Sequence, residues 1–184
     1  MDHFAALEDL LRGDSPRLAA LQAVAALNLP DCWIGAGFVR NAVWDNLHGS
    51  PPTFPAADVD VIWFAHDVLD EGADLDIERT LRADSPRFAW SVKNQARMHR
   101  RNGDAPYRSV ADAMRHWPET ATAVAARFDG GRVEINAPLG LDDLFALRLR
   151  PTPAFAAEKW PVFQQRLSSK RWLDLYPRLE ILRR

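Results

Sequence analysis

The sequence predicts an α+β protein in which a small mixed β-sheet is flanked by helices. Helical and strand-like segments do not alternate strictly along the chain, which favours this class over a regularly wound α/β fold. The 184 residues are 47% hydrophobic and 26% charged, a globular composition with enough chain to bury a core. Residues 59–64 are apolar at almost every position, which indicates a strand in the middle of the sheet.

The first half of the chain contains helical and strand-like patterns in turn. Apolar residues at helical spacing predict helices over 4–11 and 18–27, with Ser15 as the cap and Pro16 at the first helical position of the second. We then expect, in order, a strand over 32–34, a helix over 38–47, a proline-rich loop over 48–55, the strand over 59–64, and a helix that ends near residue 82.

The second half of the chain predicts shorter elements. We expect a strand over 88–92, helices over 94–101, 109–116 and 119–127, a turn over 129–131, a strand over 132–136, and a short helix over 141–147. Pro151 and Pro153 mark a linker, and a helix over 155–172 is interrupted at Pro161. The chain is therefore expected to form one domain over residues 1–150 and a helical extension over 151–184 packed on the same domain.

Charge and cysteine content exclude several classes of protein. The net charge of −2 and the isoelectric point of about 6.2 argue against a protein that coats long nucleic acid. The single cysteine, Cys32, excludes an internal disulfide and a multi-cysteine zinc site, and its apolar neighbours indicate a buried thiol. The sequence shows neither a secretion signal nor a membrane-spanning run, so we expect a cytoplasmic protein.

A pair of glycines stands where a short strand turns into a helix. Gly35 and Gly37 would leave the N–H groups of the helix N-terminus open to an anion such as a phosphate. A plain tight turn is the alternative. A dinucleotide-binding fingerprint is disfavoured because Arg40 stands where its third glycine belongs. Arg40, with Asn41 beside it, could reach a triphosphate, or could instead form a structural pair with Asp45 or Asp58.

Two aspartates, Asp58 and Asp60, are separated by one residue at the start of the central strand. Side chains at this spacing point the same way along a strand, so both carboxylates could hold a divalent cation. The alternative is a turn-capping Asp58 and a solvated Asp60. We expect Glu134 on a neighbouring strand to be the third metal ligand, although an exposed glutamate on an edge strand fits the pattern nearly as well. Asp142 and Asp143 are alternative third ligands, but they are typical of a helix start.

A basic segment follows the strand over 88–92. Lys93, Arg97 and Arg101 fall at four-residue spacing, and Asn94 can both donate and accept hydrogen bonds. We expect Lys93, Asn94 and Arg97 to bind phosphate or base. A solvated basic helix face is the alternative.

Taken together, five segments resemble the nucleotidyltransferase superfamily that includes DNA polymerase beta and the CCA-adding enzymes, and in particular a small bacterial branch of nucleotidyltransferase-like proteins. These segments are residues 35–41, 58–60, 92–99, 117–122 and 138–145. The resemblance implies a nucleotidyltransferase-like fold, with the phosphates held at Gly35 and Gly37, two Mg²⁺ ions at Asp58 and Asp60, and Glu134 completing the site. The chain departs from the pattern in three ways: Ala36 in the middle of the glycine motif, a proline-rich insertion before Asp58, and no long basic region that would bind tRNA.

The expected reaction is a metal-dependent transfer of a nucleoside monophosphate from a nucleoside triphosphate to an acceptor. In this reaction Arg40, Lys93 and Arg97 would stabilise the phosphate charge. One alternative is a catalytically inactive nucleotide-binding protein of the same fold. The other is a glycosyltransferase that grips a nucleotide sugar through Asp58 and Asp60. The sequence leaves the acceptor, the base and the oligomeric state open.

Overall fold

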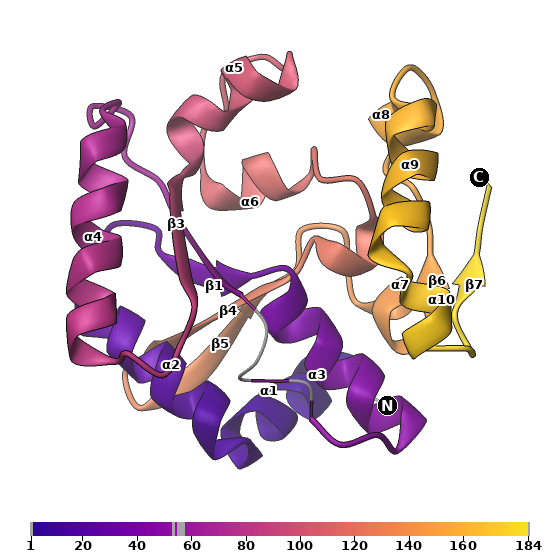
Figure 1. Ribbon diagram of the computed structural model, residues 1–184, viewed down its shortest axis with the longest axis horizontal. Helices are drawn as coiled ribbons and strands as arrows, with labels where there is room; N and C mark the ends of the chain where they lie inside the picture. The colour runs from indigo at the N-terminus through magenta and orange to yellow at the C-terminus, as the bar shows by residue number, and fades with distance from the viewer. Residues whose placement is uncertain (1, 53, 55–57, 184) are drawn as a thin grey trace.

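The computed structural model describes residues 2–52, 54 and 58–183. In that part of the chain a five-stranded sheet has the order β3-β2-β1-β4-β5, with β2 and β3 parallel and the other pairs antiparallel. The strands are β1 (Trp33–Gly35), β2 (Val59–Trp63), β3 (Trp90–Asn94), β4 (Ala125–Asp129) and β5 (Arg132–Asn136) (Figure 1). The predicted α+β class and small mixed sheet are confirmed, and β2 is an interior strand, as its apolar sequence indicates.

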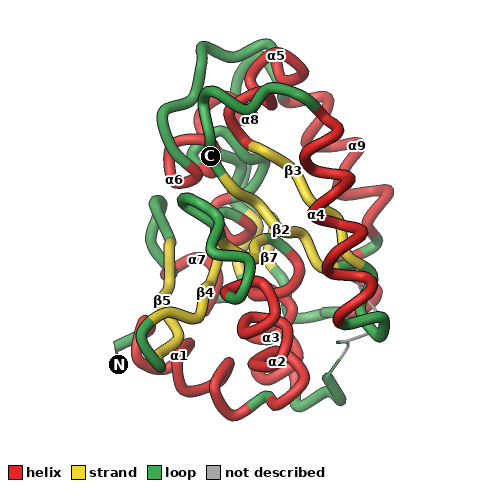
Figure 2. The backbone as a smooth tube through the Cα atoms, turned by 90° about the vertical axis from the view of Figure 1, so that its left-hand side faces the viewer, coloured by secondary structure: helices red, strands yellow, loops and turns green. Residues whose placement is uncertain are grey.

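The main hydrophobic core lies between one face of the sheet and the longer helices. These are α1 (His3–Gly13), α2 (Ser15–Ala25), α3 (Gly37–His48) and α4 (Glu71–Asp84). Ile34 on β1 is the register partner of Val61 on β2 and of Ala126 on β4, so these three side chains lie on this face of the sheet. Figures 1 and 2 show α1, α2 and α3 on one side of the sheet.

The opposite face of the sheet carries a smaller core and is only partly covered. Trp33, Ile62 and Ala125 pack there against Val110 and Met114 of α6 (Val110–Met114). The 3₁₀ turn η1 (Gln95–Arg97) and α5 (Met98–Asn102) lead from β3 toward this face. Because α6 is short, part of the face stays open, and the candidate site lies in that part.

The C-terminal segment packs against the rest of the chain. It contains α8 (Pro153–Ala156), α9 (Trp160–Lys170), α10 (Trp172–Leu175) and β7 (Glu180–Ile181). The elements η2 (Thr120–Thr122), α7 (Asp142–Phe145) and β6 (Arg148–Leu149) precede it in the chain, and β6 pairs in parallel with β7. Trp172, Tyr176 and Leu179 are buried in the main core. No helix in the described part of the chain has the length and apolarity needed to cross a bilayer.

Three element predictions differ from the structure. The helix expected over 119–127 is η2 followed by β4, because residues 125–129 pair with β5 across the Gly130–Gly131 turn. The helix expected over 94–101 begins later, since Asn94 is the last residue of β3 and caps η1. Pro161 lies in the first turn of α9, where its missing N–H costs nothing, so it starts a helix rather than interrupting one.

Two smaller details also differ from expectation. The cap of α2 is Asp14, whose carboxylate accepts from the N–H of Arg17, and Ser15 is already helical. The proline-rich loop expected over 48–55 includes residues 53 and 55, which lie outside the described residues.

Candidate active site

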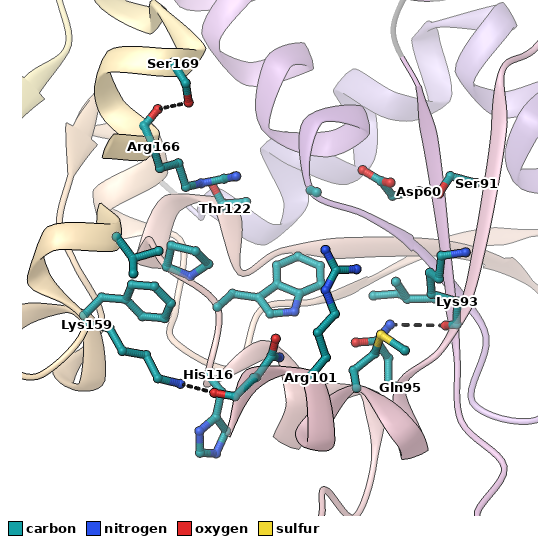
Figure 3. A pocket seen from close by; sticks show the side chains of 18 of the residues that line it. Asp60, Ser91, Lys93, Gln95, Arg101, His116, Thr122, Lys159, Arg166 and Ser169 are labelled. Atoms are coloured by element: carbon teal, nitrogen blue, oxygen red, sulfur yellow. Dashed lines mark hydrogen bonds between the residues drawn. The ribbon is translucent and has the colours of Figure 1, made fainter. Parts of the chain in front are cut away.

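Asp60 is placed at the open face of the sheet by the register of three strands. It is the partner of Gly35 on β1 and of Ser91 on β3. Its side chain borders a cleft of about 760 Å³ whose walls come from the sheet, from α5 and from α9 (Figure 3). This volume is within the range of roughly 300–1,000 Å³ that is typical of small-molecule sites.

Asp58 and Asp60 are neighbouring carboxylates at the start of β2. Within the described residues, neither carboxylate takes part in a hydrogen bond or a salt bridge. Burial, and then the negative charge of Asp58, raise the pKa of the Asp60 carboxyl above its ordinary value. Asp58 is exposed, and Asp60 is half-buried. Such a pair is unfavourable alone and fits a divalent cation, since carboxylate oxygens are the ligands that Mg²⁺ prefers.

The N-terminus of α3 meets the cleft at Ala36. The first intrahelical bond runs from the Arg40 N–H to the Ala36 carbonyl, so the N–H groups of residues 37–39 have no acceptor within the helix. Ala36 lines the cleft and has φ +54° and ψ −125°, a conformation that favours glycine. The helix N-terminus therefore offers free donors and positive dipole charge close to Asp60.

The cleft is rich in positive charge. Four basic side chains line it: Lys93 from β3, Arg101 from α5, and Lys159 and Arg166 from the C-terminal segment. Among the described lining residues, only Asp60 is acidic. Lys93 and Arg101 have no ion-pair partner in the part of the chain that the structure describes. A cleft with this balance suits an anion bound together with a cation.

The family model described as nucleotidyltransferase matches residues 22–181. The chain belongs to the nucleotidyltransferase family. The predicted resemblance is thereby confirmed, and family and fold support a role in nucleotidyl transfer.

Two solved structures are similar to this family member. One, titled as an NMR structure that reveals a CCA-adding enzyme head domain, is 34% identical, with a TM-score of 0.85 over 96% of this chain and 94% of that one. The other, a tRNA-processing enzyme in an apo form, is 16% identical, with a TM-score of 0.54 over 89% of this chain and 44% of the longer chain, and shows the fold alone. A search of curated protein sequences gave no match.

Arg40, expected at the phosphates, is buried behind the cleft wall. Its guanidinium lies 4.7 Å from the ring centre of Trp44 and 4.5 Å from that of Trp172, and it donates to Thr122 Oγ1 at 3.0 Å and to Asn41 Oδ1 at 2.9 Å. Burial lowers its pKa to about 10. Neither Arg40 nor Asn41 lines the cleft. In this family member Arg40 supports the wall through Thr122, and Asn41 accepts from Arg40. Among the described salt bridges, none joins Arg40 to Asp45 or Asp58, the alternative partners.

Of the basic segment, Lys93 reaches the cleft, but Asn94 and Arg97 do not. The Asn94 amide is fully buried and donates to the carbonyls of Ala65 and Val68. Arg97 is buried against Asp74 and also pairs with Glu71. The expected helix face is absent because Lys93 and Asn94 are still in β3. Lys93 and Arg101 line the same cleft, but from β3 and α5 rather than from one helix.

Glu134 is not brought to the aspartate pair. It lies on the edge strand β5, three strands from β2, and pairs with Arg127 at 2.6 Å. Three strand spacings amount to about 14 Å, too far to share an ion with Asp60. Within the described residues, no group of three histidine, cysteine or acidic side chains is arranged to hold a metal. The alternatives Asp142 and Asp143 also lie elsewhere, near His3 and paired with Arg150, respectively.

Lys159 and Arg166 belong to no sequence pattern that marks a site, and Arg101 is marked only by its four-residue spacing from Arg97. The two C-terminal residues lie about one hundred positions from Asp60 in the chain, and no local motif marks them. Only the packing of the C-terminal segment over the open face reveals them.

Proposed function

We propose that the protein transfers a nucleoside monophosphate from a nucleoside triphosphate to an acceptor, with Asp58 and Asp60 as ligands of Mg²⁺. The observation that carries this proposal is the partly buried Asp60, which has no hydrogen-bond or ion-pair partner among the described residues and lies in a cation-rich cleft beside the N-terminus of α3. Mg²⁺ commonly takes one or two carboxylates and completes its shell with water and substrate phosphates, so two aspartates fit it without Glu134.

The bound cation would activate the attacking oxygen and neutralise the leaving pyrophosphate. The residues of the chain would hold the substrate for this step. The N–H groups at the start of α3 would bind phosphate oxygens, and Lys93 and Arg101, which are unpaired among the described residues, would offset the phosphate charge. Gly35 and Gly37 would act through the backbone that they shape, not through contacts of their own.

The partner that we propose is thus a nucleoside triphosphate, with an acceptor of unspecified class. The net charge of −2 continues to argue against long nucleic acid as that acceptor. We also propose that the protein is located in the cytoplasm. The family assignment favours nucleotidyl transfer over the glycosyltransferase alternative.

Pyrophosphate release from each of the four common ribonucleoside triphosphates, with and without Mg²⁺, tests this function. Asp60→Asn removes the charge at constant shape and should lower the rate by about 100-fold or more. Glu134→Gln is the matched control, because it makes the same chemical change outside the cleft, and its rate should stay close to wild type. Equal rates for the wild type and Asp60→Asn would contradict the proposal.

One observation favours a second candidate, a protein that binds nucleotides without transferring them. Within the described residues, Asp58 and Asp60 have no third acidic side chain beside them. Such a protein would bind a triphosphate with Mg²⁺ yet release no pyrophosphate, so the same assay together with a binding measurement separates the two.

A further inference from the structure

We propose that Arg166 of α9 is a substrate-binding residue that donates to the nucleotide phosphates from the wall opposite Asp60. The inference rests on the proposed function and extends it, because it assigns part of the phosphate site to the C-terminal segment. Figure 3 shows Asp60 and Arg166 on opposite sides of the cleft, with the Arg166 side chain extending toward the sheet beside Thr122.

Arg166 is fixed in place by two contacts. Its Nε donates to Glu119 Oε1 at 2.7 Å, and its guanidinium carbon lies 5.2 Å from the ring centre of Trp172. Glu119 is completely buried, and its other carboxylate oxygen has no partner among the described residues. A buried carboxylate held by one arginine nitrogen anchors that arginine firmly, since losing the contact would leave the charge unpaired.

The remaining donors of Arg166 stay available. Within the described residues, only Nε of the Arg166 guanidinium has a hydrogen-bond acceptor, and the two terminal nitrogens have none. The side chain lines the cleft and is 28% exposed. The two terminal nitrogens can therefore form the forked contact that arginine makes with phosphate. Lys159 on the same wall differs, because its ammonium already donates to Asp104 and to the carbonyl of Asn102.

Trp172 links this arginine to the core. The guanidinium carbons of Arg166 and Arg40 lie 5.2 Å and 4.5 Å, respectively, from the centre of its ring. Arg40 in turn holds Thr122, which lines the cleft beside Arg166. Glu119 and Trp172 are thus positioning residues for Arg166, and they tie the C-terminal wall to the helix that begins at the glycine motif.

Calorimetric titration with inorganic triphosphate, without metal, tests the assignment apart from catalysis. Arg166→Gln should weaken binding tenfold or more, and Arg166→Lys should weaken it less, because the charge remains but the fork is lost. Arg171→Ala is the control: Arg171 is exposed and pairs with Asp174 outside the cleft, so binding should match wild type. Binding by Arg166→Gln equal to wild type would overturn the inference.

A second variant guards against misfolding. If thermal melting shows that Arg166→Gln does not fold, the double variant Glu119→Gln, Arg166→Gln removes both buried charges together and is titrated instead, with the same expected loss and the same contradicting result. The two proposals fail differently. A wild type that binds triphosphate through Arg166 but releases no pyrophosphate ends the proposed reaction alone, whereas normal triphosphate binding by the Arg166 variants ends this inference alone.

Discussion

Asp60 lies directly opposite Gly35 in the β1–β2 ladder, and Gly35 is crowded on that same face by Trp117. A Cβ at Gly35 would come within 3.0 Å of the Trp117 ring and 3.1 Å of the Ile62 Cδ1 atom. Glycine is needed there for this close approach rather than for an unusual φ. The first glycine of the motif therefore lets Trp117 close one wall of the cleft next to the aspartate.

Gly35→Ala should accordingly destabilise the protein, because two packed side chains must shift. We expect a loss of about 1–3 kcal/mol, measured by denaturant unfolding. Gly13→Ala is the control, since a Cβ at Gly13 meets nothing within 4 Å. If the Gly35→Ala variant is as stable as the wild type, Trp117 does not pack closely against this position.

Ala36→Gly should have the opposite effect on stability. Ala36 has φ +54°, where an L side chain is strained, and glycine removes that strain at a cost in unfolded-chain entropy. We expect a net gain of about 1 kcal/mol, or a rise in melting temperature of roughly 2–4 °C. Ala19→Gly, in the regular helix α2, should instead lower the melting temperature. A lower melting temperature for Ala36→Gly than for the wild type would contradict a strained backbone at this residue.

Cys32 should be inert in the folded protein. Burial, and then the charge of Asp31, raise its pKa to about 12. At pH 8 only roughly one thiol in ten thousand is then ionised, and the thiolate is the reactive form. A chromogenic disulfide reagent should leave the native protein unmodified over an hour and should react stoichiometrically in denaturant. Rapid modification of the native protein would show that the thiol is accessible.

The C-terminal segment should be inseparable from the domain formed by residues 1–150. Trp172 is 5% exposed and packs edge-on against Trp44, with ring centres 5.8 Å apart. Trp172→Ala should cost about 3–5 kcal/mol, because it opens a large cavity in the shared core. Leu173→Ala, at an exposed neighbour, should cost little. Two separate unfolding transitions in the full chain would contradict a shared core.

The part of the fold that local patterns could predict is the stretch from β1 to β2. The short strand, the glycine turn, the helix and the second strand follow one another with clear local signals. Asp60 lines the cleft from β2, and Asp58 directly precedes this strand. These signals act within a few residues, so no distant contact is needed to interpret them.

The remaining strands and the walls of the cleft depend on contacts between segments that local patterns do not predict. Residues 119–127 are rich in alanine, which favours helix locally, but pairing with β5 makes residues 125–129 a strand. The Asp129-Gly130-Gly131 turn was the available signal for a hairpin. Glu134 alternates correctly for its strand, yet the strand order that separates it from Asp60 is set by tertiary packing. Arg166 carries no local signal at all.

Electron paramagnetic resonance of Mn²⁺, titrated into the protein with a non-hydrolysable nucleoside triphosphate analogue, tests most directly whether the aspartate pair holds a cation at the nucleotide. We predict saturable Mn²⁺ binding by the wild type and by Glu134→Gln, with affinity reduced by about tenfold or more in Asp60→Asn. If Asp60→Asn binds Mn²⁺ as tightly as the wild type does, the cation is held elsewhere and the proposed site is refuted.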